Sequence, residues 1–385
     1  MLPAFSFAAP ARILFGRGQA ASLPQDIRAM AGRVMLIHGR NPARIKGLAD
    51  ALAAAGGEIT RFSVPAEPDL PLIETALAQA RASRPDLVLA IGGGAVIDAG
   101  KAIAALAPAT RPVMDHLEVV GRGLPLDQPP LPFVAVPTTA GTGAEVTRNA
   151  VLSVPEYRRK VSLRDARMLP RLALIDPALT DGCPWPVTLA SGLDAVTQVV
   201  EPFLCTAANP LTDALCADAI PRGLAALTRL AGTEDPAARD EMAWVSLCGG
   251  LALANAGLGV VHGLAGPLGG LSGAAHGAIC GALLPHALIA NDRAMARDGR
   301  MRARMDSVAR WIGAAFGAPG ATLPEAARLL ADWSRGAGLS GLDGLGITAD
   351  DRRSAALAAA GSSSMRANPV PLTPADLETL MEEAR

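Results

Sequence analysis

The first half of the chain alternates between short apolar segments and segments rich in alanine and leucine, and this alternation constrains its fold most strongly. The segments at residues 33–38, 58–64, 86–91, 132–136 and 172–175 have the length and composition of strands, and all of them except residues 58–64 are largely apolar. The segments at residues 42–55, 71–83 and 95–107 have those of helices. Strands that alternate with such helices are typical of βαβ units, so we predict a parallel, Rossmann-like sheet.

The pattern changes near residue 178, where strand-like segments stop. Further helices are predicted at residues 186–205, 210–230, 237–256, 300–316, 323–336 and 374–383. A chain of 385 residues is long enough for two or three domains. We therefore expect an α/β domain over residues 1–178, followed by an all-helical domain over residues 179–385.

Composition excludes several classes of function. The chain has 35 lysine and arginine residues against 36 aspartate and glutamate residues, which gives no basis for binding nucleic acid or an anionic membrane. It has no apolar run of about 18 residues, so no transmembrane helix is expected. Its five cysteines form no CxxC pair, which is typical of reduced thiols. Together these features predict a cytoplasmic protein of enzyme size.

Two loops of small residues follow predicted strands and are candidates for nucleotide binding. Three glycines at residues 92–94 separate a strand from a helix, where a ligand can approach the backbone closely and the helix N-terminus offers N–H groups to an anion. The second loop, residues 137–145, carries three hydroxyl side chains: Thr138, Thr139 and Thr142. Loops at the carboxyl ends of parallel strands face one crevice, so the pair favours a nucleotide over a simple strand–helix turn.

A third glycine-containing segment, residues 16–21, matches the loose GxGxxA dinucleotide pattern. No acidic residue ends a second strand about 20 residues later, as that pattern requires. We therefore predict a hairpin turn at residues 16–21 rather than a phosphate site.

Polar residues able to bind a metal occur in the helical half. Asp194 and Gln198 are four residues apart, so a helix places them on one face. His262 and His276, two of five histidines in the chain, lie in glycine-rich, apolar surroundings. Buried histidines are commonly structural, whereas imidazole and carboxylate groups that meet in one place can bind a metal. From the residues alone, a metal site and a structural role both stay open.

In their order along the chain, these motifs resemble the iron-containing (group III) alcohol dehydrogenase family. Residues 92–101, with Asp98 and Lys101, resemble its GGGSxxDxxK phosphate loop, and residues 138–145 resemble its TTAGTGSE loop. Further resemblance lies in its metal-domain and C-terminal signatures, at residues 193–195, 255–267, 276–277, 284–286 and 364–369. The resemblance extends over nearly the whole chain.

The resemblance implies a fold, an activity and cofactors. The fold is an N-terminal Rossmann-like domain followed by a helical domain, a dehydroquinate-synthase-like architecture with the cofactor in the cleft between the domains. The activity is NAD(P)-dependent interconversion of an alcohol and an aldehyde or ketone by hydride transfer, assisted by Fe(II) or Zn(II) as a Lewis acid. Because the family commonly forms dimers, a homodimer is expected.

The resemblance also assigns the site residues. Asp194, His262 and His276 would act through the metal as catalytic residues, with Gln198 as a further metal ligand. The expected cofactor-binding residues are Gly39, Gly93, Gly94, Ala95, Asp98, Thr138, Thr139, Thr142 and Lys160.

Two positions depart from the family pattern. Gln198 stands where the family has its first histidine ligand, and an amide oxygen is a weaker donor to Fe(II) or Zn(II) than an imidazole. The site would therefore bind metal weakly or not at all. Gly266 stands where many members have a second histidine, so proton transfer would use water, a cofactor ribose hydroxyl or another side chain.

The residue after the first predicted strand bears on the choice between NAD and NADP. Members of the family that prefer NAD have an aspartate there, whereas this chain has Gly39, followed by Arg40 and Arg44. Without the carboxylate a 2′-phosphate is not repelled, and either arginine could bind it. We therefore expect use of NADP(H), or of both cofactors.

Two other functions stay open on the sequence. A metal-independent reductase of an oxo acid, similar to maleylacetate reductases, would use Lys160, Arg148 or Arg366 to hold a carboxylate. A lyase or synthase on the same scaffold, or an inactive nucleotide-binding protein, would account for the altered metal site. Steady turnover of a carbonyl substrate would exclude this last group.

Overall fold

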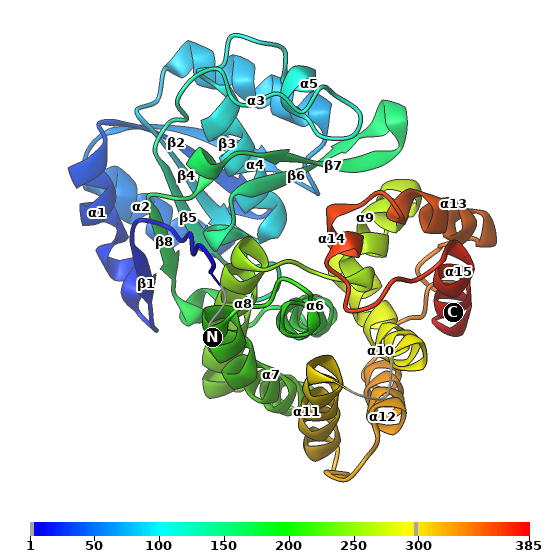
Figure 1. Ribbon diagram of the computed structural model, residues 1–385. Helices are drawn as coiled ribbons and strands as arrows, with labels where there is room; N and C mark the ends of the chain where they lie inside the picture. Colours follow the sequence, from blue (N-terminus) through cyan, green and yellow to red (C-terminus); the bar gives the residue numbers. More distant parts are fainter. Residues whose placement is uncertain (1–3, 296–298) are drawn as a thin grey trace. The chain divides into compact units, whose positions relative to one another are not determined.

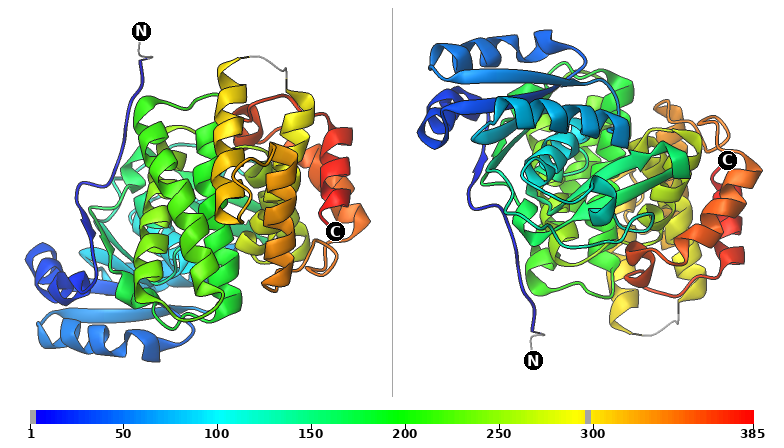
Figure 2. Two further views of the ribbon diagram at one scale, coloured as in Figure 1. Left: turned by 90° about the horizontal axis from the view of Figure 1, so that it is seen from below. Right: turned by 90° about the horizontal axis from the view of Figure 1, so that it is seen from above.

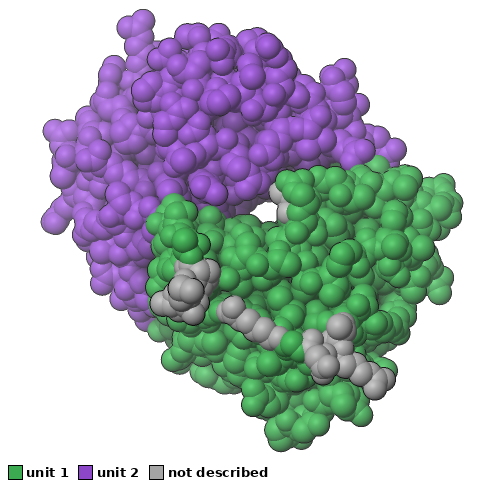
Figure 3. Space-filling view, in the orientation of Figure 1, with its two compact units in different colours: residues 1–8, 140–142, 182–385 green, residues 9–139, 143–181 purple. Residues whose placement is uncertain are grey.

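The structure, a computed structural model, describes residues 4–295 and 299–385 (Figure 1). The chain divides into two compact units, which Figure 3 shows in different colours. The unit that we call the helical unit comprises the N-terminal residues through Ala8, Ala140–Thr142 and Gly182–Arg385. The other, the sheet unit, comprises Ala9–Thr139 and Gly143–Asp181.

The sheet unit contains a six-stranded parallel sheet with the strand order β1-β8-β5-β4-β2-β3. Its strands are β1 (Ile13–Phe15), β2 (Arg33–Gly39), β3 (Glu58–Val64), β4 (Leu87–Gly92), β5 (Phe133–Pro137) and β8 (Leu172–Ile175). The central strands β4 and β5 are buried along their whole length, as expected where helices cover both faces. The predicted parallel sheet is confirmed.

The strand order reverses beside β2. From β2 the chain crosses to β3 on one side, and it then returns to β4 on the other side, where His38 is paired with Ile91. Ligands of open α/β sheets bind beyond the carboxyl ends of the strands at such a reversal. The loops that follow Gly39 and Gly92 therefore flank the expected ligand position.

Helices cover the sheet, and an additional hairpin lies outside it. The helices of this unit are α1 (Leu23–Met30), α2 (Lys46–Ala54), α3 (Leu70–Ser83), α4 (Gly94–Leu106) and the short α5 (Val113–His116). The segment predicted as one helix at residues 42–55 begins as a 3-10 turn, η2 (Pro42–Ile45), before α2. The antiparallel hairpin of β6 (Asn149–Val154) and β7 (Arg159–Arg164) was not predicted.

The predicted hairpin turn at residues 16–21 is wrong. Strand β1 pairs in parallel with β8, so the chain does not fold back on it and instead continues into η1 (Gln19–Ser22) and α1. The Asp176 carboxylate accepts hydrogen bonds from the N–H groups of Gly18 at 2.9 Å and Ala20 at 2.8 Å. Those N–H groups, which a phosphate would use, are therefore already paired.

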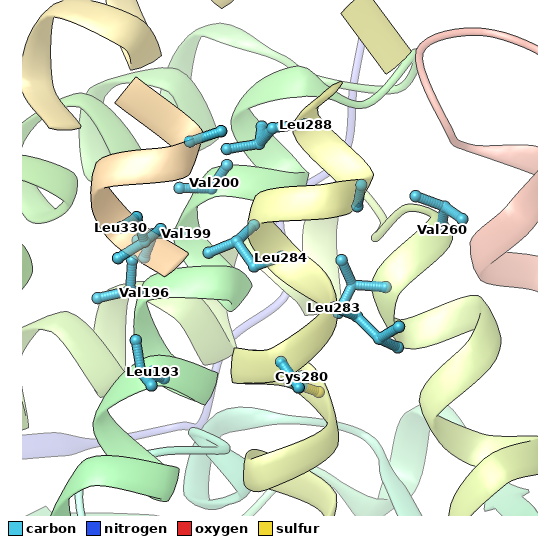
Figure 4. Packing of buried hydrophobic residues seen from close by; sticks show 14 of the residues in the cluster. Leu193, Val196, Val199, Val200, Val260, Cys280, Leu283, Leu284, Leu288 and Leu330 are labelled. Atoms are coloured by element: carbon cyan, nitrogen blue, oxygen red, sulfur yellow. The ribbon is translucent and has the colours of Figure 1, made fainter. Parts of the chain in front are cut away.

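The helical unit has no strand among its described residues. Its helices are α6 (Trp185–Leu204), α7 (Pro210–Leu230), α8 (Pro236–Asn255), α9 (Val260–Ser272), α10 (His276–Ala294), α11 (Arg300–Ala315), α12 (Leu323–Gly336), α13 (Ala349–Ala359), α14 (Ser363–Arg366) and α15 (Pro374–Glu383). α6 packs against α7, α8 and α10 (Figures 1 and 2). Its buried residues, including Leu193 and Val196, meet Leu284 of α10 in one apolar core (Figure 4).

Within residues 4–295 and 299–385, no individual helix has both the length and the apolar character needed to cross a membrane. Among the described helices, α8 and α9 meet that length and composition when taken together, and a bend of 97° separates them.

Candidate active site

The glycine loop after β4 has the geometry of an anion site. β4 ends at Gly92, Gly93 is the N-cap of α4, and α4 begins at Gly94. A Cβ atom at Gly92 would lie 2.6 Å from Cβ of Val96, and one at Gly93 would lie 3.2 Å from Oγ1 of Thr139. Larger residues would therefore crowd the loop. Because the first N–H groups of a helix have no acceptor within it, this loop can hold a phosphate.

The loop after β5 begins beside the glycine loop, at the carboxyl ends of the strands. β4 and β5 are neighbours, and the Thr138 N–H donates to the Gly92 carbonyl at 2.9 Å. Gly39 ends β2, the other neighbour of β4. At the carboxyl ends of three neighbouring strands, the structure thus gathers Gly39, Gly93, Gly94, Ala95, Thr138 and Thr139.

The other expected cofactor residues have partners within their own units. Asp98, on α4, accepts a hydrogen bond from the Val151 N–H at 3.2 Å. The nearly buried Lys160, on β7, forms an ion pair with Glu67. Thr142 belongs to the helical unit, where its carbonyl accepts a hydrogen bond from an amide side chain. Contacts of these three residues with a cofactor stay predictions.

Side chains from three helices of the helical unit converge on one small volume. Asp194 comes from α6, His262 from α9, and His276 and Cys280 from α10. One potential ligand atom of each lies within 4.8 Å of the others. His276 and Cys280 are four residues apart, so one face of α10 carries both. We call these four residues the metal cluster; the sequence analysis did not identify Cys280 as a member.

The centre of the metal cluster contains unpaired polar atoms. Asp194 Oδ1 lies 3.5 Å from His262 Nε2 and 3.8 Å from His276 Nε2. Asp194 Oδ1 and His262 Nε2 are buried, and neither makes a hydrogen bond to any described residue. Buried polar atoms are normally paired, because leaving them unpaired costs free energy. A carboxylate oxygen and an imidazole nitrogen that face each other in this way fit a divalent metal ion.

Glu201 fixes the orientation of His262. Its Oε2 lies 2.6 Å from His262 Nδ1, and its Oε1 accepts a hydrogen bond from the Val261 N–H at 2.7 Å. A neutral His262 whose Nδ1–H donates to Glu201 would present the lone pair of Nε2 to the metal cluster. Carboxylates commonly hold metal-binding histidines in this manner.

The sequence analysis missed Glu201 as a site residue, although its spacing gives a signal. Asp194, Gln198 and Glu201 stand at positions i, i+4 and i+7, so one face of α6 carries all three. A carboxylate on that face, one turn beyond a candidate ligand, is placed to support the site.

The metal cluster favours positive charge. Burial disfavours the charged form of His276, but Cys280 and Asp194 outweigh it and raise the pKa of His276 to about 9. Burial likewise disfavours the Asp194 carboxylate, yet the two histidines hold its pKa below the usual value. A site that attracts protons in this way also attracts a metal cation, which displaces them.

The amide nitrogen of Gln198, the remaining expected ligand, is hydrogen-bonded outside the metal cluster. The side chain is buried on α6, and Nε2 donates to the Thr142 carbonyl at 2.6 Å. A Cβ atom at Gly249 would lie 3.4 Å from that nitrogen, so α8 confines the amide from another side. Only Oε1 of Gln198 could bind a metal.

Gly266 leaves open space next to the metal cluster. It follows His262 by four residues, so both lie on one face of α9. A Cβ atom at Gly266 would have nothing within 4 Å. The chain thus has room, rather than a side chain, at this position.

A glycine loop suited to a nucleotide on a parallel sheet, together with a helical unit that carries a candidate metal site, is the arrangement of metal-dependent oxidoreductases that use a nicotinamide cofactor. Residues 10–177 match the family described as iron-containing alcohol dehydrogenase. Residues 188–385 match the C-terminal part of the Fe-containing alcohol dehydrogenase family. The chain belongs to the iron-containing alcohol dehydrogenase family.

Individual relatives and a solved structure support the assignment to this family. Alcohol dehydrogenase 4 of Schizosaccharomyces pombe is 35% identical over 319 residues, which cover 81% of this chain and 74% of the relative. Lactaldehyde reductase of Escherichia coli (strain K12) is 33% identical over 280 residues, which cover 71% of this chain and 72% of the relative. A crystal structure of 1,3-propanediol oxidoreductase has a TM-score of 0.85 at 27% identity, with 100% of both chains covered.

The chain is accordingly an oxidoreductase that interconverts an alcohol and an aldehyde or ketone. Its family implies NAD(H) and a divalent metal, usually iron, and the unpaired atoms of the metal cluster fit such an ion. The alternative of a metal-independent oxo-acid reductase is not favoured, because the relatives are alcohol and aldehyde dehydrogenases.

Proposed function

We propose that the chain interconverts a small alcohol that carries a second oxygen substituent and the corresponding aldehyde. The observation that carries the metal-dependent part of this proposal is the buried, unpaired pair formed by Asp194 Oδ1 and His262 Nε2. The substrate class is supported by two relatives, named for lactaldehyde and 1,3-propanediol, since both compounds are small and have two oxygens.

In this proposal Asp194, His262 and His276 hold the metal. When bound, the metal supplies Lewis-acid polarisation of the substrate oxygen. Glu201 keeps the Nε2 lone pair of His262 directed into the metal cluster. His276 is partly exposed, so the metal cluster is accessible from its side. Because Gly266 provides no side chain, a proton would move through water or a ribose hydroxyl.

The dinucleotide that supplies or accepts the hydride would bind at the carboxyl ends of β2, β4 and β5. Backbone N–H groups of Gly93, Gly94 and Ala95 hold its pyrophosphate in this proposal. The remaining proposed contacts are those of Gly39, Asp98, Thr138, Thr139, Thr142 and Lys160.

We propose that NADP(H) is accepted as well as NAD(H). Gly39 provides no carboxylate at the end of β2, and both Arg40 and Arg44 are exposed nearby in the sequence. Arg44 makes one long hydrogen bond, at 3.4 Å, to the Asp181 carbonyl. Its guanidinium can exchange that contact for a 2′-phosphate at little cost.

We also propose four further features. A homodimer is proposed because members of the family commonly form dimers. A cytoplasmic location is proposed because the five cysteines form no CxxC pair. The domain boundary near residue 178 is supported by the change in composition there. Zn(II) is proposed as an alternative to Fe(II).

One experiment tests the function. Freshly purified protein is depleted of metal with a chelator, reloaded with Fe(II) or Zn(II), and assayed with NADH and NADPH on lactaldehyde, 3-hydroxypropanal, butanal and an oxo acid. We expect metal-dependent reduction of the two hydroxyaldehydes above the rate for butanal, and none of the oxo acid. Equal rates before and after metal removal would contradict the metal-dependent part, and preference for butanal would contradict the substrate class.

A further inference from the structure

Cys280 lies among the metal-binding side chains, at a place where the family resemblance assigns no ligand. We propose that Cys280, rather than Gln198, is the fourth protein ligand of the metal, which gives a set of one carboxylate, two imidazoles and one thiolate. This inference rests on the proposed metal-dependent function and names the ligand that completes its site.

The separations between the side chains suit one metal ion. Ligand atoms about 2.0–2.3 Å from a tetrahedral metal lie roughly 3.3–3.7 Å from each other. Cys280 Sγ lies 3.6 Å from His276 Nε2, and His262 Nε2 lies 3.5 Å from Asp194 Oδ1. The third separation, His276 Nε2 to Asp194 Oδ1, is 3.8 Å. Small side-chain movements are enough to bring all four atoms onto one ion.

A second observation points to a ligand in the same volume. Asp194 Oδ1 and His262 Nε2 are buried without a hydrogen-bond partner among the described residues, and both are directed at the metal cluster. The two side chains are 2% and 7% exposed, so solvent does not replace the missing partner at their surface. The thiol of Cys280 therefore stands beside polar atoms that are themselves short of a positive partner.

The position of Cys280 on α10 makes it a fixed ligand. The residue is fully buried, and its helix packs against α6 through apolar side chains such as Leu193 and Leu284 (Figure 4). With His276 four residues earlier on the same helix, the two donors are held at a spacing that helices use for metal binding.

Gln198 is a poor competitor for the same role. Its Nε2 is engaged by the Thr142 carbonyl at 2.6 Å, and its amide is neutral. A thiolate binds zinc-type metals far more strongly than an amide oxygen does. The loss of an imidazole at position 198 is thus compensated by a sulfur from another helix.

The exchange alters the charge and the selectivity of the site. Binding of a divalent ion would release the thiol proton to solvent, and the thiolate and Asp194 would then neutralise both charges of the metal. Three imidazoles and one carboxylate would leave one positive charge. Because sulfur is a soft donor, the site would prefer Zn(II) to Fe(II).

The test uses Co(II) as a spectroscopic probe of the full chain. Metal is removed with a chelator, the protein is titrated with Co(II), and the absorption spectrum and the bound cobalt are measured. Thiolate bound to Co(II) gives an intense near-ultraviolet charge-transfer band that oxygen and nitrogen ligands do not give. We expect a single cobalt ion per chain with this band.

Three variants identify the ligand. Cys280→Ser should remove the band and lower cobalt affinity by at least about tenfold. Cys216→Ser, which changes an equally buried cysteine on α7, should keep both the band and the affinity. Gln198→Ala should keep the band and bind cobalt with unchanged affinity.

The outcomes separate this inference from the proposed function. Stoichiometric cobalt that is lost in His262→Ala but shows no thiolate band in the unaltered chain overturns the role of Cys280 and leaves the metal-dependent function intact. A band that persists in Cys280→Ser, or cobalt lost only in Gln198→Ala, also overturns it. No cobalt binding at all overturns both proposals. Preference for Fe(II) over Zn(II) in direct competition contradicts the selectivity.

Discussion

Each unit of this molecule buries ionisable side chains. Those of the sheet unit's Lys101 and of the helical unit's metal cluster differ in whether their polar atoms have hydrogen-bond partners. In the sheet unit, Lys101 and Glu145 are 1% and 2% exposed. The Lys101 ammonium donates to Thr147 Oγ1 at 2.8 Å and to the Asn149 carbonyl at 2.6 Å. In the helical unit, by contrast, polar atoms of Asp194 and His262 face each other without such partners.

The pKa shifts also differ between these two sets of buried side chains. Burial lowers the pKa of Lys101 to about 8 and raises that of Glu145 to about 7, so both move toward their neutral forms. In the metal cluster, neighbouring charges outweigh burial, lower the pKa of Asp194 and raise that of His276 to about 9. The Lys101 ammonium is thus paired within the fold, whereas the unpaired atoms of Asp194 and His262 fit a ligand.

Removal of a central ligand should have the largest effect. His262→Ala is expected to lower metal affinity and turnover by more than about 100-fold, since loss of even an outer partner of a ligand costs 10–100-fold. Elemental analysis and steady-state rates check this. The matched control is His286→Ala, which changes another histidine of α10 outside the metal cluster. Equal metal content in the two variants would contradict the assignment.

Glu145→Gln should change stability and leave the metal site unaffected. Because the folded-state pKa of Glu145 is raised to about 7, the folded chain holds this proton more tightly, and the stability so gained is lost as pH rises from 4.5 to 7. The loss amounts to about 3 kcal/mol, and the glutamine variant should not show it. Urea unfolding at several pH values measures this, with exposed Glu156→Gln as control. An unchanged pH slope would contradict the expectation.

Glu201→Gln should weaken the metal site without removing a ligand. The amide can still hold the Nδ1 proton of His262 but lacks the negative charge, so we expect a 10–100-fold loss of metal affinity. Metal titration of the chelator-treated protein measures this loss. A variant that binds metal as tightly as the unaltered chain would show that the Glu201 charge is not needed.

Lys101→Met should have the smallest effect of the four and be confined to stability. The change removes two buried hydrogen bonds and leaves the Asn149 carbonyl without this donor, so we expect a loss of about 1–3 kcal/mol at pH 7. Thermal and urea unfolding measure it, and metal content should stay as it is. Reduced metal content in the folded variant would break the distinction between the two buried groups.

The sequence predicts the sheet better than it predicts the helices around the metal. Strands at residues 58–64 and 172–175 are observed at these residues, because both carry local signals: β-branched and aromatic residues between glycine and proline in the first, and a continuous apolar segment in the second. α9 and α10 were missed, since several glycines lie inside them besides a proline, and only tertiary packing stabilises such helices. The β6–β7 hairpin was missed because half of the residues in its two strands are polar.

The candidate site divides in the same way. Asp194, His262 and His276 could be named from motifs whose order resembles a known family. Cys280 could not, because its proximity to Asp194 depends on how α10 packs against α6, which no local pattern encodes. For Gln198 the motif gives a position in the site but not the direction of its side chain, whose Nε2 donates to the Thr142 carbonyl.

The pairing of β1 with β8 has a consequence for the order in which the protein is built. Ile13 is paired with Ala173, and the turn after β1 is held by Asp176, so neither contact can form until the ribosome has passed that residue. At 5–20 residues per second, the first strand emerges on the order of 10 s before its partner exists. Because β1 is an edge strand of the sheet, the other five strands do not need it in order to pair. The N-terminal strand therefore joins the sheet last, as a closing element of a nascent domain.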